Sequence, residues 1–112
     1  MYVDGVEGFR QRVQSKFGAR AKYQCSYLSQ GYVLFDLYGV FGFRFFVSEE
    51  PYDTLQVALE LASNRVTNSL LGRELVFIEN SERGVEEALN VVDWYCRLRL
   101  PEKYLAVCDE LY

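Results

Sequence analysis

Aromatic residues crowd into one short stretch of the chain, and this stretch constrains the fold more than any other feature. The segment from Tyr32 to Tyr52 holds eight of the eighteen aromatic residues in a chain of 112. They are Tyr32, Phe35, Tyr38, Phe41, Phe43, Phe45, Phe46 and Tyr52. Aromatic side chains favour pleated, half-buried surfaces, so the stretch predicts packed β-strands. Gly31, Gly39 and Gly42 are placed to form the turns between them.

A three-stranded antiparallel meander is the structure that this pattern indicates. Its strands are expected over residues 21–30, 32–38 and 43–48. In the first strand, Tyr23, Cys25 and Tyr27 alternate with polar residues, which predicts that the three share one face. The third strand is mostly apolar on both faces, as is typical of a central or doubly covered strand.

Helices are predicted before and after this meander in the sequence. They are expected over residues 4–17, where Phe9, Val13 and Phe17 form one narrow apolar face, and from Asp53 to near Gly72. Two more are expected from Ser81, a good N-cap, to Leu100 ahead of Pro101, and over 102–112. One more strand, short and buried, is expected over residues 74–79, which include Phe77. The element order is then αβββαβαα, and residues 1–112 form a single domain. We expect an α+β fold in which a mainly antiparallel sheet, the three-stranded meander plus one strand, has helices packed on one face.

The helix expected from Asp53 has the strongest local signal. Asp53 and Gln56 have the spacing of a capping box, and Tyr52 is placed to pack on Val57 as a hydrophobic staple. The apolar stripe of this helix is Leu55, Ala58, Leu59, Ala62, Val66 and Leu70. We predict that this helix packs centrally on the sheet.

The absence of histidine excludes most familiar catalytic arrangements. Without histidine, no Ser-His-Asp or Cys-His arrangement and no Cys/His zinc site can form. Cys25, Cys96 and Cys108 each lie among apolar residues, and we expect three free thiols in a reducing cytoplasm. Carboxylates and tyrosines remain as the only chemical resources, so the sequence predicts a protein that is not an enzyme and has no catalytic residues, metal site or cofactor.

Charge is distributed unevenly along the chain, and its net value is -4. Residues 1–48 carry six Lys/Arg and three Asp/Glu, whereas residues 49–112 carry six and thirteen. An acidic domain is repelled by phosphate, so we expect no nucleic-acid binding. The chain also lacks a signal-peptide pattern and an apolar run of about 20 residues, so we expect a soluble, cytoplasmic protein with no membrane partner.

One carboxylate lies inside the aromatic stretch. Asp36 falls in a predicted strand among apolar residues, and a carboxylate there requires a partner. Arg44 on the neighbouring strand is the natural one. We predict a cross-strand ion pair between them, worth less than about 1 kcal/mol if it is exposed.

The candidate partner-binding residues are five carboxylates that span one loop and the outer face of the third predicted helix. They are Glu79, Glu82, Glu86, Glu87 and Asp93. A solubilising surface is the plain interpretation of such a set. The functional interpretation is a docking surface for a basic protein, because clustered carboxylates speed association and select the partner.

Two classes of function fit these features. The first is a non-enzymatic cytoplasmic protein that neutralises one basic protein, in the manner of a toxin-immunity protein or a phage inhibitor of a defence complex. The alternative is a dimeric secretion-type chaperone, whose dimer face would use exposed aromatic residues such as Tyr32 and Tyr38. A monomer would favour the first class, and a homodimer the second.

Overall fold

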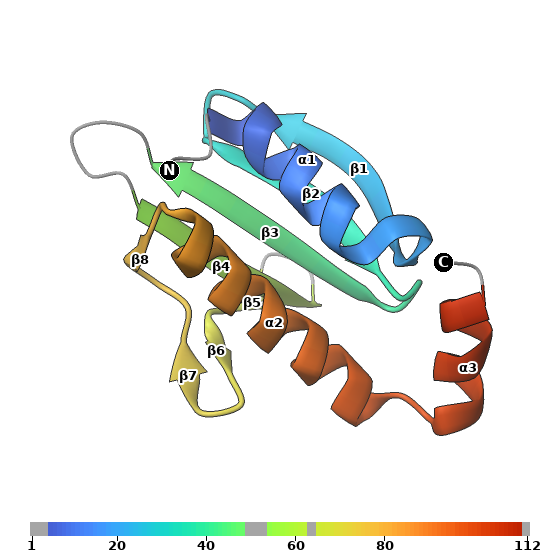
Figure 1. The fold of residues 1–112 in the computed structure, drawn as a ribbon. Helices are drawn as coiled ribbons and strands as arrows, with labels where there is room; N and C mark the ends of the chain where they lie inside the picture. Colours follow the sequence, from blue (N-terminus) through green and yellow to red (C-terminus); the bar gives the residue numbers. More distant parts are fainter. Residues whose placement is uncertain (1–4, 49–53, 63–64, 111–112) are drawn as a thin grey trace.

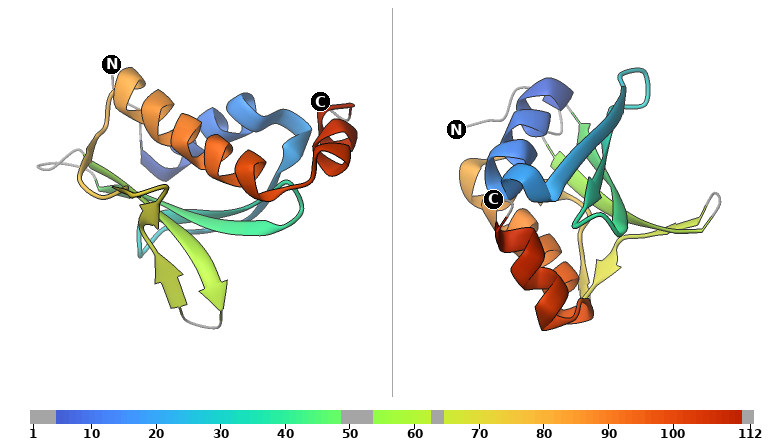
Figure 2. Two further views of the ribbon diagram at one scale, coloured as in Figure 1. Left: turned by 90° about the horizontal axis from the view of Figure 1, so that it is seen from below. Right: turned by 90° about the vertical axis from the view of Figure 1, so that its right-hand side faces the viewer.

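A computed structural model describes residues 5–48, 54–62 and 65–110, and Figure 1 shows an antiparallel sheet lined by helices. In chain order the elements are α1 (Gly5–Phe17), the 3-10 turn η1 (Gly18–Arg20), β1 (Ala21–Tyr27), β2 (Tyr32–Leu37), β3 (Phe41–Ser48), β4 (Thr54–Ala62), β5 (Arg65–Thr67), β6 (Ser69–Leu70), β7 (Arg73–Glu74), β8 (Ile78–Glu79), α2 (Glu82–Arg99) and α3 (Glu102–Glu110). The main sheet has the order β1-β2-β3-β4-β5, with β8 also paired to β4, while β6 and β7 form a separate hairpin. Helices α1 and α2 lie on the same face of the sheet (Figure 2), so the predicted α+β class and its one-sided helical layer are confirmed.

Helix α1 packs on the sheet through the narrow apolar stripe that the sequence predicts. Phe9, Val13 and Phe17 recur every four residues and are all buried. The ring of Phe9 lies 5.5 Å from the ring of Phe45 on β3, measured between centroids. The stripe therefore anchors α1 over the centre of the sheet.

A bulge at Gln24 divides β1 into two parts that present opposite faces. The pairing of β1 with β2 shifts between Tyr23 and Cys25. Tyr23 faces the helices, where its ring meets Phe35 edge-on at 5.7 Å, whereas Cys25 and Tyr27 lie on the other face. The prediction that Tyr23, Cys25 and Tyr27 share one face is wrong, because one extra residue reverses the alternation of every side chain after it.

The segment predicted as a central helix from Asp53 is a strand. β4 pairs with β3 from Thr54 to Leu59, so the predicted order αβββαβαα is wrong at its fifth element. Within the described residues, α1 and the 3-10 turn η1 are followed by eight strands and then by α2 and α3. The backbone groups along the outer edge of β3 need partners, and β4 supplies them, whereas a helix would leave that edge open.

The apolar residues of β4 fit both periods, which explains the error. Leu55, Val57 and Leu59 alternate toward the helices and are buried. Leu55, Ala58 and Leu59 also recur at helical spacing. Gln56, predicted to close a capping box, is a strand residue, while Tyr52 and Asp53 lie outside the described residues.

The strand predicted over residues 74–79 is interrupted. Glu74 belongs to β7 and Ile78–Glu79 to β8, and the residues between them belong to no strand. Leu75 remains attached to β4, because its carbonyl accepts a hydrogen bond from the Val57 N–H at 2.9 Å. The interruption leaves Phe77 between two points that are fixed to the sheet.

Helix α2 begins and ends where the sequence predicts. Ser81 is extended, and its hydroxyl accepts a hydrogen bond from the Gly84 N–H at 3.1 Å, as an N-cap does. The helix ends at Arg99, and Leu100 is extended ahead of Pro101. Its buried residues are Gly84, Val85, Ala88, Leu89, Val91, Val92 and Cys96.

Gly84 is expected to resist substitution although it lies in a helix. A Cβ at this position would lie 2.1 Å from the backbone oxygen of Glu79. We expect Gly84→Ala to lower the free energy of unfolding by about 1–3 kcal/mol through overpacking, although alanine is the better helix former by about 1 kcal/mol. Urea unfolding measures the change. The exposed Glu86→Ala, as control, should stay within about 0.5 kcal/mol, and an equally stable Gly84→Ala would contradict the prediction.

Candidate functional site

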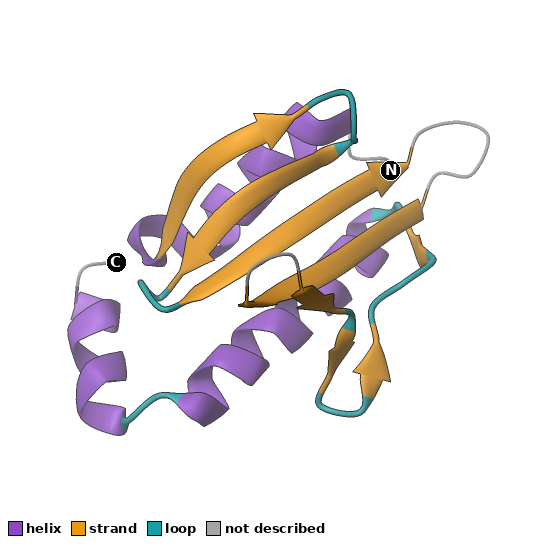
Figure 3. Ribbon diagram, turned by 180° about the vertical axis from the view of Figure 1, so that it is seen from behind, coloured by secondary structure: helices purple, strands orange, loops and turns teal. Residues whose placement is uncertain are grey.

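The sheet face opposite α1 and α2, here called the open face, is not covered by those helices (Figure 3). Residues paired directly across neighbouring strands share a face, so the strand register assigns its members to rows. The aromatic row is Tyr27, Tyr32, Phe46 and Gln56. The mixed row is Cys25, Leu34, Arg44 and Ala58, and the charged row is Lys22, Asp36, Gly42 and Glu60.

Neighbouring aromatic rings in the aromatic row pack against one another. The rings of Tyr27 and Tyr32 stack with centroids 4.7 Å apart, and those of Tyr32 and Phe46 lie 4.8 Å apart. Tyr32 is only 7% exposed although no helix covers it, whereas Tyr27 at the edge is 42% exposed. A stacking platform for nucleic-acid bases needs free ring faces, and Tyr32 has none to offer.

One ion pair and one further hydrogen bond hold charged side chains of the open face. The Arg44 guanidinium donates two hydrogen bonds to Glu60 Oε2, at 2.9 and 3.0 Å, and lies 5.5 Å from the ring centroid of Tyr32. The Gln24 amide donates to Asp36 at 2.7 Å. The predicted pair between Asp36 and Arg44 is wrong, because the register places Arg44 opposite Leu34 and Asp36 opposite Gly42.

Three of the five predicted acidic site residues are close to basic residues. Glu82 lies 3.7 Å from Arg12 of α1, and Glu87 lies 3.1 Å from Arg83 one turn earlier. Glu86 lines a cavity of about 220 Å³ between α1 and α2, together with Arg12, Lys16, Ser15 and Leu89. The surface between the two helices is therefore of mixed charge.

The remaining two acidic residues lie apart from this cavity between α1 and α2. Glu79 is exposed in β8. Asp93 is half-buried and accepts a hydrogen bond from the Tyr38 hydroxyl. The structure thus does not gather Glu79, Glu82, Glu86, Glu87 and Asp93 into one continuous acidic surface.

Tyr38 links the end of β2 to helix α2. Its hydroxyl donates to Asp93 and accepts from Arg97 Nη1 at 3.0 Å. Burial raises the pKa of Tyr38 to about 12, and the hydrogen bond to Asp93 acts in the same direction, so the phenol stays protonated at neutral pH. Tyr38 is buried at this junction, and Tyr32 is buried in the aromatic row, so the prediction that both are exposed aromatic residues is wrong.

Helix α3 is attached to the same junction largely by polar contacts. The Tyr104 hydroxyl donates to the Tyr38 carbonyl, and Arg97 Nη2 donates to Asp109 Oδ2 at 2.8 Å. Arg20 Nη1 lies 3.4 Å from the same carboxylate. Cys108 is the buried residue of α3.

Acidification is expected to loosen α3 before α2. The hydrogen bond from Arg97 holds the pKa of Asp109 below its ordinary value of 3.8. This stabilisation is present above the ordinary pKa and disappears as the pH falls through the lowered one. Hydrogen exchange should show that α3 amides lose protection relative to α2 amides below about pH 4, and Asp109→Asn should show the loss already at neutral pH. Equal protection of α3 and α2 at all pH values would contradict this.

The three cysteines are free thiols, as predicted. Cys25 is half-buried on the open face, whereas Cys96 and Cys108 are buried. Burial raises the pKa of Cys96 to about 12, so its thiol is unreactive at neutral pH.

We expect a thiol reagent to modify Cys25 first in the native protein and all three cysteines in denaturant. A single thiol in denaturant would mean that a disulfide forms.

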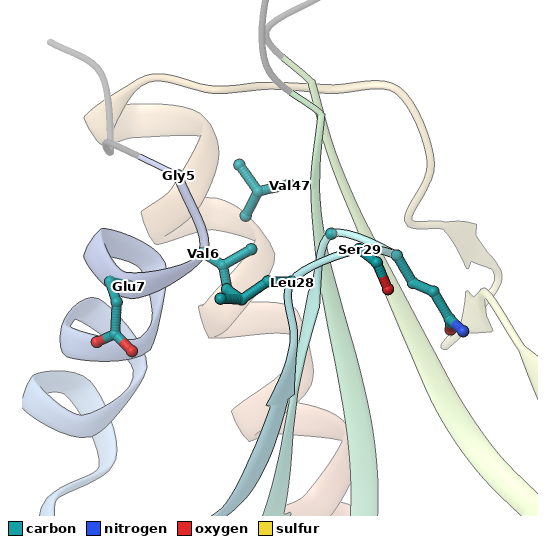
Figure 4. Close-up of a pocket in the computed structure, with 8 residues that line it drawn as sticks. Gly5, Val6, Glu7, Leu28, Ser29 and Val47 are labelled. Carbon is teal, nitrogen blue, oxygen red and sulfur yellow. The ribbon is translucent and has the colours of Figure 1, made fainter.

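A cavity of about 530 Å³ lies between the start of α1 and the turn that joins β1 to β2 (Figure 4). Val6, Leu28 and Val47 give it an apolar side, and Glu7 is its titratable group. A single carboxylate supplies no acid–base pair. In the described part of the chain, no group of His, Cys, Asp and Glu side chains is placed to hold a metal ion. Among the described helices, none has the length and hydrophobicity that a transmembrane span requires.

Comparisons with known proteins found no match that indicates a function. No protein-family model matches the chain, and no curated protein or solved structure is significantly similar to it.

Proposed function

We propose that this chain is a non-enzymatic cytoplasmic binding protein that neutralises one protein partner, and that the partner docks on the open face. One observation carries the proposal: an antiparallel sheet normally places polar residues on its uncovered side, whereas this side has aromatic and aliphatic residues at its centre. Tyr27, Tyr32, Leu34 and Phe46 lie together on adjacent strands. Polar residues lie next to this apolar centre: Lys22 and Asp36 on one side, and Gln56 and Glu60 on another.

This composition resembles that of a protein-binding surface. Such surfaces have an apolar centre enriched in tyrosine, phenylalanine and arginine, within a polar rim. The stacked rings are held in place before binding, so little side-chain freedom is lost when a partner covers them. The net charge of -4 favours a basic partner by steering its approach, whereas the balanced charges of the open face itself favour neither sign.

The second candidate, a dimeric secretion-type chaperone, uses the same face differently. The open face pairs Arg44 with Glu60 and also carries Lys22 and Asp36. A face with both signs of charge can be complementary to itself in a two-fold dimer. Light scattering of the purified protein separates the candidates: a dimer that Tyr27→Lys dissociates favours the chaperone, and a monomer favours the neutralising protein.

A photoreactive phenylalanine analogue in place of Tyr27 tests where a partner docks. In the cells that naturally make the protein, we expect a crosslinked protein from position 27 and none from Gln11, an exposed residue of α1 on the other side of the molecule. A crosslink from both positions, or from neither, would contradict the proposal.

The acidic residues are tested separately. If they steer a basic partner, Glu86→Lys together with Glu87→Lys should slow association at low salt and leave the melting temperature unchanged. An unchanged association rate would leave the open face as the docking surface without help from α2.

A further inference from the structure

Phe77 combines a strained backbone with an exposed aromatic side chain. Its ring is part of a residue that is 86% exposed, and its φ angle is +53°. A residue with a Cβ is disfavoured in this left-handed region, and a bulky one most of all. The conformation of Phe77 therefore costs local stability, and its exposed side chain gains little packing within the described chain in return.

The chain on both sides of Phe77 holds it in this conformation. The Leu75 carbonyl accepts from the Val57 N–H at 2.9 Å, and Ile78 pairs with Leu55. These two attachments to β4 are out of register by one residue, so the segment between them contains a bulge. A bulge redirects a side chain, and bulges are frequent beside functional sites.

Two carboxylates flank Phe77 in the sequence. Glu74 and Glu79 are both exposed, and neither forms an ion pair within the described residues. Arg73 is the basic residue beside them on β7. Within the described segment from Arg73 to Glu79 there are therefore two carboxylates and one guanidinium.

We propose that Phe77 is an anchor that inserts into an apolar pocket, rimmed by lysine or arginine, on a partner protein. Aromatic anchors that fill a pocket dominate many interfaces, and backbone strain persists where function requires a particular presentation. Glu74 and Glu79, which form no ion pair within the described residues, select a basic rim, because charge complementarity around an anchor orients the partner. The proposal rests on the proposed function only in requiring a protein partner, and Phe77 itself belongs to none of the three rows of the open face.

A stability measurement separates a functional anchor from a structural residue without any partner. Phe77→Gly relieves the left-handed strain, so we expect the melting temperature to rise by a few degrees. Leu71→Gly is the matched control, because Leu71 also has a positive φ, +53°, in the turn between β6 and β7. A fall in melting temperature for Phe77→Gly would show that the ring supports the fold and would overturn the proposal.

Crosslinking then tests the partner. With a photoreactive phenylalanine analogue at position 77, in the cells that naturally make the protein, we expect a discrete crosslinked protein of basic isoelectric point. The same analogue at Trp94, which is 62% exposed on α2, controls for general adhesion of exposed rings. The crosslink should fall at least tenfold with Glu74→Lys and Glu79→Lys combined, whereas Leu71→Gly should leave it intact.

The outcomes distinguish the two proposals. A crosslink from position 77 without one from position 27 supports the Phe77 anchor and contradicts docking on the open face. A crosslink from position 27 without one from position 77 supports docking on the open face and contradicts the Phe77 anchor. The same crosslinked proteins from positions 77 and 94, or none from position 77, would overturn the anchor.

Discussion

Replacing Phe45 with alanine is expected to lower the free energy of unfolding by about 3–5 kcal/mol. Phe45 is fully buried on the helix side of β3, and its ring lies 5.5 Å from Phe9, 6.1 Å from Phe35 and 6.1 Å from Phe43. Its removal leaves a cavity where α1 meets the sheet. Total stability of a domain is about 5–15 kcal/mol, so the loss is a large share, and guanidinium unfolding followed by circular dichroism measures it.

Phe46 is the matched control for this substitution. It is the next residue on β3, has the same side chain and lies half-buried on the open face. Phe46→Ala should therefore cost clearly less than Phe45→Ala. Equal losses would mean that the open face is as tightly packed as the core, and would count against its role as an uncovered surface.

The substitution with the next largest expected effect is Leu59→Ala, at about 2–5 kcal/mol. Leu59 is 3% exposed on β4, opposite Phe43 of β3. Leu61, two residues further along the same strand, is 59% exposed, and Leu61→Ala should stay within about 0.5 kcal/mol. Urea unfolding of both variants measures the contrast, which a loss below about 0.5 kcal/mol for Leu59→Ala would contradict.

Leu59 also shows how a sequence argument can be correct about burial and wrong about structure. Its apolar neighbours predict a buried residue under either period. The choice between helix and strand depends on the unpaired edge of β3, which lies outside the local sequence. The pairing of Thr54 through Leu59 with β3 overrides the capping signal that Gln56 suggests.

The residues that form the candidate surfaces could be identified only from the tertiary structure. The bulge at Gln24 brings Tyr27 to the same face as Tyr32 and Phe46, and no residue type in the strand announces it. The acidic residues were predicted to span one loop and the outer face of one helix, but contacts with α1 and with Tyr38 divide them. Phe77 was predicted inside a buried strand, and only the register of its two attachments to β4 exposes it.

The sequence by itself determined the parts that depend on residues within about one helical turn of each other. The stripe of Phe9, Val13 and Phe17, the Ser81 cap and the stop before Pro101 all follow from such local rules. The tertiary structure alone decided the strand at Thr54–Ala62, the composition of the open face and the exposure of Phe77. Those features depend on register between strands that are distant in the chain, and a shift of one residue in that register moves each side chain to the other face.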